Sequence, residues 1–341
     1  MGRPGRDDRL TYFQHLTCGL GAGVLARTLV SPFDVVKIMT QVGTKETRDG
    51  FRRTFVNIYR TQGIRAFWKG NLMGCLRLTP FSAVQFGAYH RIKLKLADEN
   101  GRLSAFQAMI AGGLGGMVAT AVTYPTDMVK TRLVVQHTDS KRRRYSGILH
   151  AFTLILKEEG LLAFYRGMFV SLLGAIPFTA ATFAFYEIAD DIMNSNLGKP
   201  RHMRTASENL ILGCVAAALA QSASFPFDTI RKKLQAQSKV MANEGGVDVK
   251  FRGALSAYRA TKAKYGYKGF FRGNAANLCK IIPYAVVMFL AFEGGRRYFL
   301  YENGYTESLW DITPREDVDQ TLKPHELKSM LDSLKEQVQT R

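Results

Sequence analysis

Residues 32–37 read PFDVVK and follow directly on an apolar run; the chain writes the same pattern twice more, as PTDMVK at 125–130 and PFDTIR at 226–231. In each copy an aspartate stands two residues after the proline, and a base stands three residues after the aspartate. The prolines are 93 and 101 residues apart. A recurring pattern at this period predicts three copies of one structural unit of about 100 residues.

A second landmark follows each copy at a fixed spacing: GIRAFWKG at 63–70, GLLAFYRG at 160–167 and GYKGFFRG at 266–273. A proline stands ten residues beyond each final glycine, at Pro80, Pro177 and Pro283. Each unit thus contains an apolar helix, a polar loop whose amphipathic pattern predicts a short surface helix, and a second apolar helix. The predicted repeats are residues 10–100, 101–200 and 201–299, and a C-terminal tail follows at 300–341.

Uncharged stretches at 103–126, 168–186 and 209–227 are long enough to cross the hydrocarbon core of a membrane, which needs about 20 residues. The pattern predicts an all-α membrane protein with six transmembrane helices in three pseudo-threefold repeats. Pairs of small residues four apart predict close helix packing in the first helix of each repeat, at Gly19/Gly23, Gly112/Gly116 and Gly213/Ala217. In the tail, Pro324 followed by Leu327, Leu331, Leu334 and Val338 predicts a short amphipathic helix.

The net charge of +19 indicates an anionic partner, which could be nucleic acid, a lipid surface or an acidic solute. Arg142–Arg144 is a dense basic run, but no nucleic-acid-binding motif accompanies it, so we expect no nucleic-acid partner. The sequence contains no recognisable nucleophile–base set and no phosphate-binding loop, so no motif in it indicates an enzyme. The four cysteines lie in apolar stretches and lack metal-ligand spacing: Cys18, Cys75, Cys214 and Cys279. We therefore expect no metal, no catalytic residue and no cofactor.

Together these motifs resemble the signature of the mitochondrial carrier family. That signature is Pro-x-Asp/Glu-x-x-Lys/Arg-x-Lys/Arg followed by Asp/Glu-Gly-x-x-x-x-aromatic-Lys/Arg-Gly, three times over. The chain departs from it at Met39, and at Gln62 and Tyr265, where the second repeat keeps Glu159. The resemblance implies a multi-pass transporter of the mitochondrial inner membrane that works by alternating access. It also implies a monomer in contact with anionic lipid, with cardiolipin as the candidate.

The resemblance implies a gate on the matrix side, in which the acid of one repeat meets the base of the next. The implied pairs are Asp34–Lys130, Asp127–Arg231 and Asp228–Lys37. A glutamine nine residues after the proline reinforces such a gate, and Gln41 and Gln235 match it, whereas the middle repeat has Val134. The alternative is that these pairs only hold the helices together.

Three further bases lie within the predicted spans, where ionisable residues are costly and point to function: Arg27, Arg77 and Lys280. By resemblance, Arg77, Gly174 and Lys280 occupy the substrate contact points, and Gly174 with Ala175 forms a small apolar patch. Three cations beside such a patch predict a small anionic, nucleotide-like metabolite. A carboxylate carrier and a carrier-fold protein without transport activity remain alternatives, as does snorkelling of Arg77 and Lys280 to headgroups. Exchange and uniport are not distinguished.

On the cytosolic side, the family pattern is an aromatic residue, an acid, two residues and a base. The third repeat has Glu293 and Arg296, but the first has His90 with Lys93 and the second has Glu187 with Asp190. The cyclic pairing implied by the resemblance is His90–Asp190, Glu187–Arg296 and Glu293–Lys93. A histidine in this closure predicts that it is strongest at low pH. The alternative is that the two altered residues simply face water.

Overall fold

The computed structural model describes residues 9–43, 50–98, 103–136, 144–195, 205–237, 251–310, 313–315 and 318–330. The chain forms two compact units, which are treated separately below. The main unit is Arg27–Pro283, and the terminal unit combines Met1–Ala26 with Tyr284–Arg341.

Long helices dominate the described residues: α1 (Tyr12–Val42), α4 (Leu78–Leu96), α5 (Ala105–Val135), α7 (Met168–Ser195), α8 (Ala206–Ala236) and α11 (Ile281–Glu302). Five helical stretches of the described residues, containing α1, α5, α7, α8 and α11, are long and apolar enough to cross a membrane. The remaining long helix, α4, carries Arg91, Lys93 and Lys95 near its C-terminal end, so every 18-residue stretch of it contains three bases.

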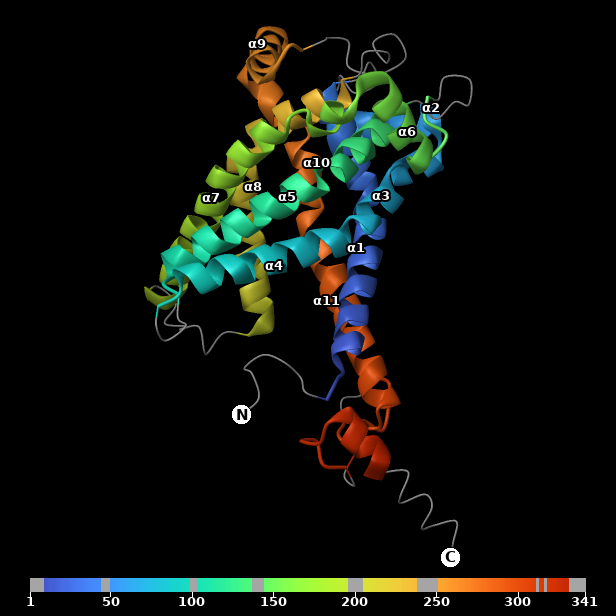
Figure 1. Cartoon of the computed structure of the whole chain (residues 1–341), viewed down its shortest axis with the longest axis vertical. Coiled ribbons are helices and arrows are strands. Elements are labelled where there is room, and N and C mark those ends of the chain that lie inside the picture. Colours follow the sequence, from blue (N-terminus) through green and yellow to red (C-terminus); the bar gives the residue numbers. More distant parts are fainter. Residues whose placement is uncertain are drawn as a thin grey trace, which may run out of the picture. The chain divides into compact units, whose positions relative to one another are not determined.

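Within the main unit, α4 packs along α5 and α7 packs along α8 (Figure 1). α4 and α5 approach each other closely at Gly115, where an added Cβ would lie 3.2 Å from the backbone oxygen of Gln85. Nothing described lies within 4 Å of a Cβ added at Gly112. Nothing described lies within 4 Å of a Cβ added at Gly213 either, so the predictions of close helix contacts at Gly112 and Gly213 are wrong. The buried small residues of α5 are Ala111, Gly115 and Ala119.

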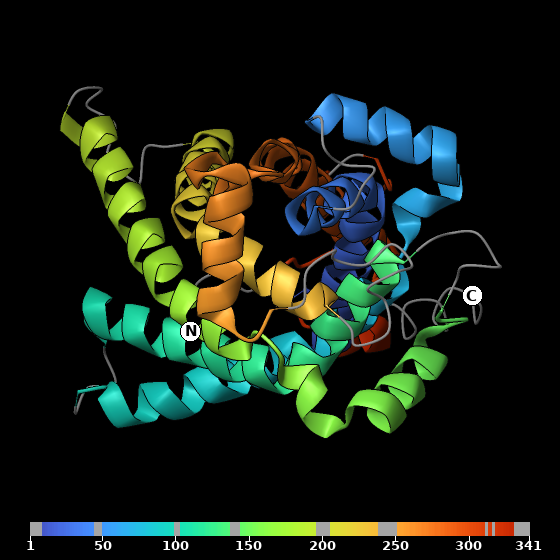
Figure 2. The ribbon, with the colours of Figure 1, turned by 90° about the horizontal axis from the view of Figure 1, so that it is seen from above.

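The predicted surface helices are present as α2 (Phe51–Gln62), α6 (Ile148–Glu159) and α9 (Ala254–Tyr265), which Figure 2 shows in blue, green and orange. Each packs against the short 3₁₀ turn that follows it: η2 (Ile64–Trp68), η3 (Leu161–Tyr165) and η6 (Tyr267–Phe271). An aromatic ring of the helix stacks on a ring of the turn in all three places, in the pairs Phe55–Phe67, Phe152–Phe164 and Tyr258–Phe270. The buried phenylalanine of the second landmark, Phe67, Phe164 or Phe270, is thus a core residue, whereas the aromatic residue that follows it is exposed.

The glycines that end the second landmark are required by the backbone. Gly70, Gly167 and Gly273 have φ of 70°, 83° and 88°, a region that favours glycine. A Cβ at each would also meet the backbone oxygen of a signature base in the following repeat: 3.1 Å for Gly70 and Lys130, 3.3 Å for Gly167 and Arg231, and 3.0 Å for Gly273 and Lys37. These glycines therefore let the second helix of one repeat approach the ion pairs of the next.

The second helix is interrupted in repeats one and three. Arg77 separates α3 (Asn71–Leu76) from α4, and Lys280 separates α10 (Asn274–Cys279) from α11. Proline follows three residues later in both places and lacks the N–H that would continue the helical hydrogen bonding. In repeat two the corresponding helix α7 is continuous, with Pro177 inside it.

In the terminal unit, the tail folds against the start of α1 and the end of α11. Leu10, Cys18, Leu300, Tyr305, Val318 and Leu327 form its buried apolar cluster. The side-chain amides of Gln14 and Asn303 donate to each other at 3.0 Å, and Asn303 also donates to the backbone oxygen of Arg9. Residues 324–330 are helical as predicted; Leu331, Leu334 and Val338 lie outside the described residues.

Candidate functional site

Three aspartates, one from each of α1, α5 and α8, bind bases of the neighbouring repeat in the main unit. Lys130 Nζ lies 3.2 Å from Asp34, Lys37 Nζ lies 2.7 Å from Asp228, and Arg231 pairs with Asp127. These are the three pairs that the resemblance implies. Their side chains are largely buried, where breaking a pair leaves an uncompensated charge. Their role as a gate stays a prediction.

Two glutamines reinforce this ring of ion pairs. Gln41 Nε2 donates to Asp228 and Gln235 Nε2 donates to Asp127, each at 3.1 Å. Val134, at the corresponding position of the middle repeat, is fully buried in a hydrophobic cluster. The Asp34–Lys130 pair therefore lacks a glutamine at that position.

Two of the three predicted substrate cations contact the ring. Arg77 donates to Asp127 Oδ1 at 3.3 Å and to the Thr123 hydroxyl at 3.1 Å. Lys280 donates to Asp34 Oδ1 at 2.8 Å. Sequence reasoning placed both at substrate contact points but did not foresee that the ring aspartates would hold them. The interruptions of the second helices at Arg77 and Lys280 bring these two side chains to the ring.

Arg27 differs from the other two cations, because it forms no ion pair or hydrogen bond among the described residues. Its Nε is buried without a partner. A Cβ added at Gly74 would lie 3.7 Å from Arg27 Nη1 and 3.3 Å from Lys130 Nζ. The ends of both side chains therefore lie next to Gly74, which has no side chain to displace them. A half-buried guanidinium without a described protein partner, beside an ammonium group, is a site for an anion.

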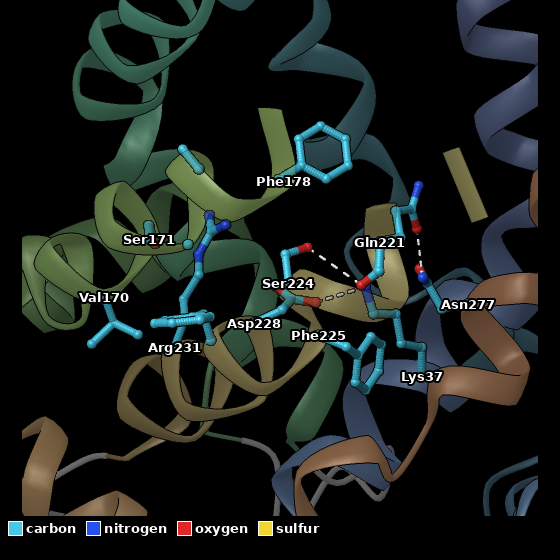
Figure 3. Close-up of a pocket in the computed structure, with 13 residues that line it drawn as sticks. Lys37, Val170, Ser171, Phe178, Gln221, Ser224, Phe225, Asp228, Arg231 and Asn277 are labelled. Carbon is cyan, nitrogen blue, oxygen red and sulfur yellow. Dashed lines mark hydrogen bonds and ion pairs between the residues drawn. The ribbon is translucent and has the colours of Figure 1, made fainter. Parts of the chain in front are cut away.

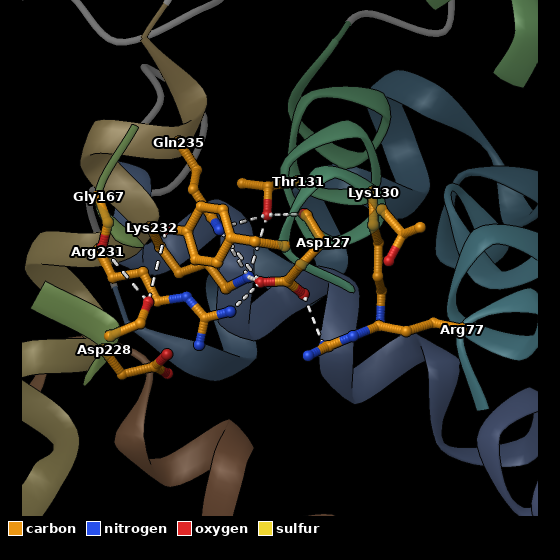
Figure 4. A network of polar contacts seen from close by, with 12 residues as sticks. Arg77, Asp127, Lys130, Thr131, Gly167, Asp228, Arg231, Lys232 and Gln235 are labelled. Carbon is orange, nitrogen blue, oxygen red and sulfur yellow. Dashed lines mark hydrogen bonds and ion pairs between the residues drawn. The ribbon is translucent and has the colours of Figure 1, made fainter. Parts of the chain in front are cut away.

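Lys232 is a functional candidate that sequence reasoning missed. Its Nζ lies 3.1 Å from Asp127, beside Arg231 and Gln235 (Figure 4). It occupies the variable position of the signature, where the first repeat has Ile38. That change from an apolar residue to a base was the available signal.

Among the residues that the structure describes, the ring and its surroundings contain seven bases and three carboxylates, which leaves an excess of four positive charges. The carboxylates are Asp34, Asp127 and Asp228. The bases are Arg27, Lys37, Arg77, Lys130, Arg231, Lys232 and Lys280. Unbalanced charge of one sign within a membrane is costly, so this site favours a ligand with several negative charges.

A pocket beside the ring contains the predicted Gly174–Ala175 patch (Figure 3). Phe178 of α7, Gln221 of α8 and Asn277 of α10 line it, together with Ser171, Phe225, Asp228 and Arg231. Asn277 donates to the Gln221 side chain, whereas Asn277 Oδ1 is buried without a partner. The pocket therefore offers both an aromatic surface and an unused hydrogen-bond acceptor.

Gly174 itself is needed for helix packing. A Cβ at this position would lie 2.8 Å from the Cβ of Phe227, closer than side chains allow. Phe227 of α8 occupies the space that the missing side chain leaves, and Gly174 and Ala175 both line the pocket.

The departures from the signature lie outside the ring and follow from packing. In repeat two, buried Arg132 binds Glu159 through both guanidinium nitrogens, at 2.5 and 2.9 Å. In repeat three, Lys233 and Arg272 lie over the ring of Tyr265, so cation–π contacts replace the carboxylate. In repeat one, Met39 is buried, and Gln62 instead accepts a hydrogen bond from Lys69.

The predicted cytosolic pair His90–Asp190 is not formed in this structure, since His90 is exposed and has no ion pair with Asp190 among the described residues. In the terminal unit, Glu293 binds Arg296 at 3.2 Å and Arg297 at 3.4 Å on its own helix. The other two pairs, Glu187–Arg296 and Glu293–Lys93, each join residues of the two separately described units, so they stay predictions.

Membrane-length helices, a threefold motif and buried ion pairs beside a basic pocket together define a multi-pass membrane transporter. The family description "Mitochondrial carrier protein" matches residues 8–100, 101–197 and 203–303. The chain therefore belongs to the mitochondrial carrier family and has its six-helix, three-repeat fold in the mitochondrial inner membrane. This confirms the fold class and the location predicted from the sequence.

Individual relatives agree with this assignment. The chain is 42% identical to solute carrier family 25 member 43 of Danio rerio, over 96% of this chain and 93% of the relative. It is also 42% identical to the Mus musculus protein of that name, over 95% and 94%. The mitochondrial adenine nucleotide transporter ADNT1 of Arabidopsis thaliana is 31% identical, over 82% of this chain and 84% of the relative.

Proposed function

We propose that this mitochondrial transporter carries a nucleotide-like polyanion. The observation that carries the proposal is the excess of four positive charges around the ring, including Arg27, whose buried Nε has no partner. A ligand with two or three phosphate groups would balance this charge. Arginine binds phosphate through two parallel hydrogen bonds and lysine binds it as a compact charge, so both residue types suit such a ligand.

The phosphates would bind to Arg27, Arg77 and Lys280, and the base would enter the pocket beside Ala175. Phe178 provides an aromatic face for a flat ring, and the amides of Gln221 and Asn277 provide donors and acceptors for its edge. A carboxylate substrate would use the cations but not these groups. The adenine nucleotide transporter among the relatives is consistent with this assignment.

The matrix gate is the ring of ion pairs Asp34–Lys130, Asp127–Arg231 and Asp228–Lys37, with its glutamines. Because Lys280 also binds Asp34, which would then keep only Lys130, an anion that attracts Lys280 weakens the ring at the same time. Substrate binding would thereby promote opening toward the matrix. Closure on the cytosolic side would use His90–Asp190, Glu187–Arg296 and Glu293–Lys93.

The protein would act as a monomer, because one chain supplies all three repeats. It would be in contact with anionic lipid, with cardiolipin as the candidate.

A second pocket, lined by Arg166, Phe169, Arg252 and Gly253, leads to the N-terminal end of α9. Helix N-termini bind phosphate through their free N–H groups, and α9 contains three bases and no acid. Loss of cardiolipin-dependent thermal stabilisation on Arg252→Glu, with Arg259→Glu as a control, would support this site.

The substrate is tested by thermal-shift screening of the purified protein, since a ligand stabilises the state it binds. We expect ADP or ATP to raise the melting temperature and malate or citrate to leave it unchanged. Stabilisation by carboxylates alone would favour the carboxylate alternative. Stabilisation by no anion, with no uptake, would favour a protein without transport activity.

A further inference from the structure

Lys232 makes the Asp127–Arg231 ion pair unlike the other two ion pairs of the ring. Its ammonium group donates to Asp127 Oδ2 at 3.1 Å, to the Thr131 hydroxyl at 3.0 Å and to Gln235 Oε1 at 3.0 Å. All three of its N–H groups are therefore used, and the side chain is buried. The corresponding positions of the other repeats hold Ile38 and Thr131, so neither of those repeats has a base at this position.

The two oxygens of Asp127 have different partners. Oδ2 accepts from Arg231, Lys232 and Gln235, all of which belong to α8. Oδ1 accepts from Arg77, at 3.3 Å, and from no residue of α8 among those described. If Arg77 leaves, the carboxylate keeps three donors and two positive partners.

Asp34 provides the contrast within the same ring. Lys280 binds its Oδ1 at 2.8 Å and Lys130 binds its Oδ2 at 3.2 Å. If Lys280 leaves, one positive partner remains. Arg77 and Lys280 are therefore not equally free to bind a substrate.

We propose that Lys232 is a positioning residue that keeps Asp127 neutralised when the substrate draws Arg77 away. The inference rests on the proposed function, because Arg77 must bind the transported anion. Without Lys232, Asp127 would have Arg231 and Arg77 as its only positive partners, and releasing Arg77 from a buried carboxylate would cost more. Lys232 thus sets the affinity for the substrate without touching it.

The experiment uses the purified full chain and four variants. Lys232→Met removes the charge, Lys232→Gln removes it but keeps hydrogen bonding, and Lys232→Arg keeps it. Lys233→Met is the matched control, since Lys233 is the next residue but donates to Thr261 and does not contact Asp127. Two neutral variants ensure that misfolding of one does not end the test.

The first readout needs no substrate. Phenylglyoxal modifies accessible guanidinium groups, and the rate at Arg77 is followed by mass spectrometry of its peptide. We expect both neutral variants to slow this modification about tenfold, because Asp127 then holds Arg77 more tightly. Lys232→Arg and Lys233→Met should react at the wild-type rate. An unchanged or faster rate in the folded neutral variants overturns the proposal.

The second readout uses ADP. In proteoliposomes, we expect the neutral variants to raise KM for ADP about tenfold at an unchanged maximal rate. A purely structural role would instead lower the maximal rate and leave KM unchanged, which overturns the proposal. If the wild type neither binds nor transports ADP, the nucleotide assignment fails, while the phenylglyoxal rates still decide the role of Lys232.

Discussion

Arg77 Nη1 lies 3.3 Å from Asp127 Oδ1, so a candidate substrate-binding side chain and a ring carboxylate are direct partners. The same carboxylate binds Arg231 across the interface of α5 and α8. A substrate anion that competes for Arg77 therefore acts on the ring itself. No long-range pathway is needed to couple binding to opening.

Loss of Arg77 and loss of Lys280 should have different consequences for stability. Both Arg77→Ala and Lys280→Ala are expected to abolish the melting-temperature increase caused by ADP. Lys280→Ala should also lower the stability of the substrate-free protein, because Asp34 keeps only Lys130. Arg77→Ala should leave it nearly unchanged, because Asp127 keeps Arg231 and Lys232. The reverse order of the two substrate-free melting temperatures would contradict this account.

Neutralising Asp127 should be the most disruptive change at the ring. Asp127→Asn leaves three bases without a carboxylate, and breaking a buried ion pair costs about 3–5 kcal/mol. Asp228→Asn should cost less, since the Asp228 side chain is 25% exposed and that of Asp127 is 8% exposed. Thermal unfolding of both variants in the same detergent measures the difference. Equal losses would mean that Lys232 and Arg77 do not depend on Asp127.

The signature glycines should be needed for the backbone contact with the ring. Gly273→Ala places a Cβ 3.0 Å from the Lys37 backbone oxygen at a φ of 88°, and such strain costs about 1–3 kcal/mol. Gly213→Ala is the control, because nothing described lies within 4 Å of its Cβ and it lies inside α8. That control should be neutral or stabilising by up to about 1 kcal/mol. Similar melting temperatures for the two variants would show that the contact is unimportant.

The cytosolic closure should depend on pH through His90. A protonated imidazole attracts the Asp190 carboxylate, so this pair would be strongest at low pH and would weaken as the histidine loses its proton. Transport should vary with pH on the cytosolic side, and His90→Lys should flatten the dependence while keeping the pair. A profile that neither His90→Lys nor Asp190→Asn changes would exclude the switch.

Much of the fold could be predicted because the threefold repetition fixes the register of the helices. The ring residues follow from the signature. Each glycine that ends the second landmark marks a position where the backbone has a positive φ and where a side chain would meet a neighbouring helix. The packing of α5 was less predictable. The glycine spacing predicted a contact at Gly112, but the buried small residues of α5 include two alanines, Ala111 and Ala119. The sequence pattern did not distinguish these alanines from the other apolar residues of the helix.

The partners of the substrate cations could not be read from the sequence. Arg77 is 50 residues from Asp127 and Lys280 is 246 residues from Asp34, so only the folded chain brings them together. Lys232 was missed for a related reason. A base in a variable signature position is ordinary on a helix surface, and its burial against α5 depends on how the two helices face each other.

The most direct test of the central claim is uptake by purified protein in liposomes. Radiolabelled ADP is supplied outside, with unlabelled ATP, malate or buffer inside, which also separates exchange from uniport. We predict rapid ADP uptake that Arg77→Ala and Lys280→Ala abolish, with both variants folded and present in equal amounts. Uptake of a neutral or cationic solute that is indifferent to both substitutions would contradict the account.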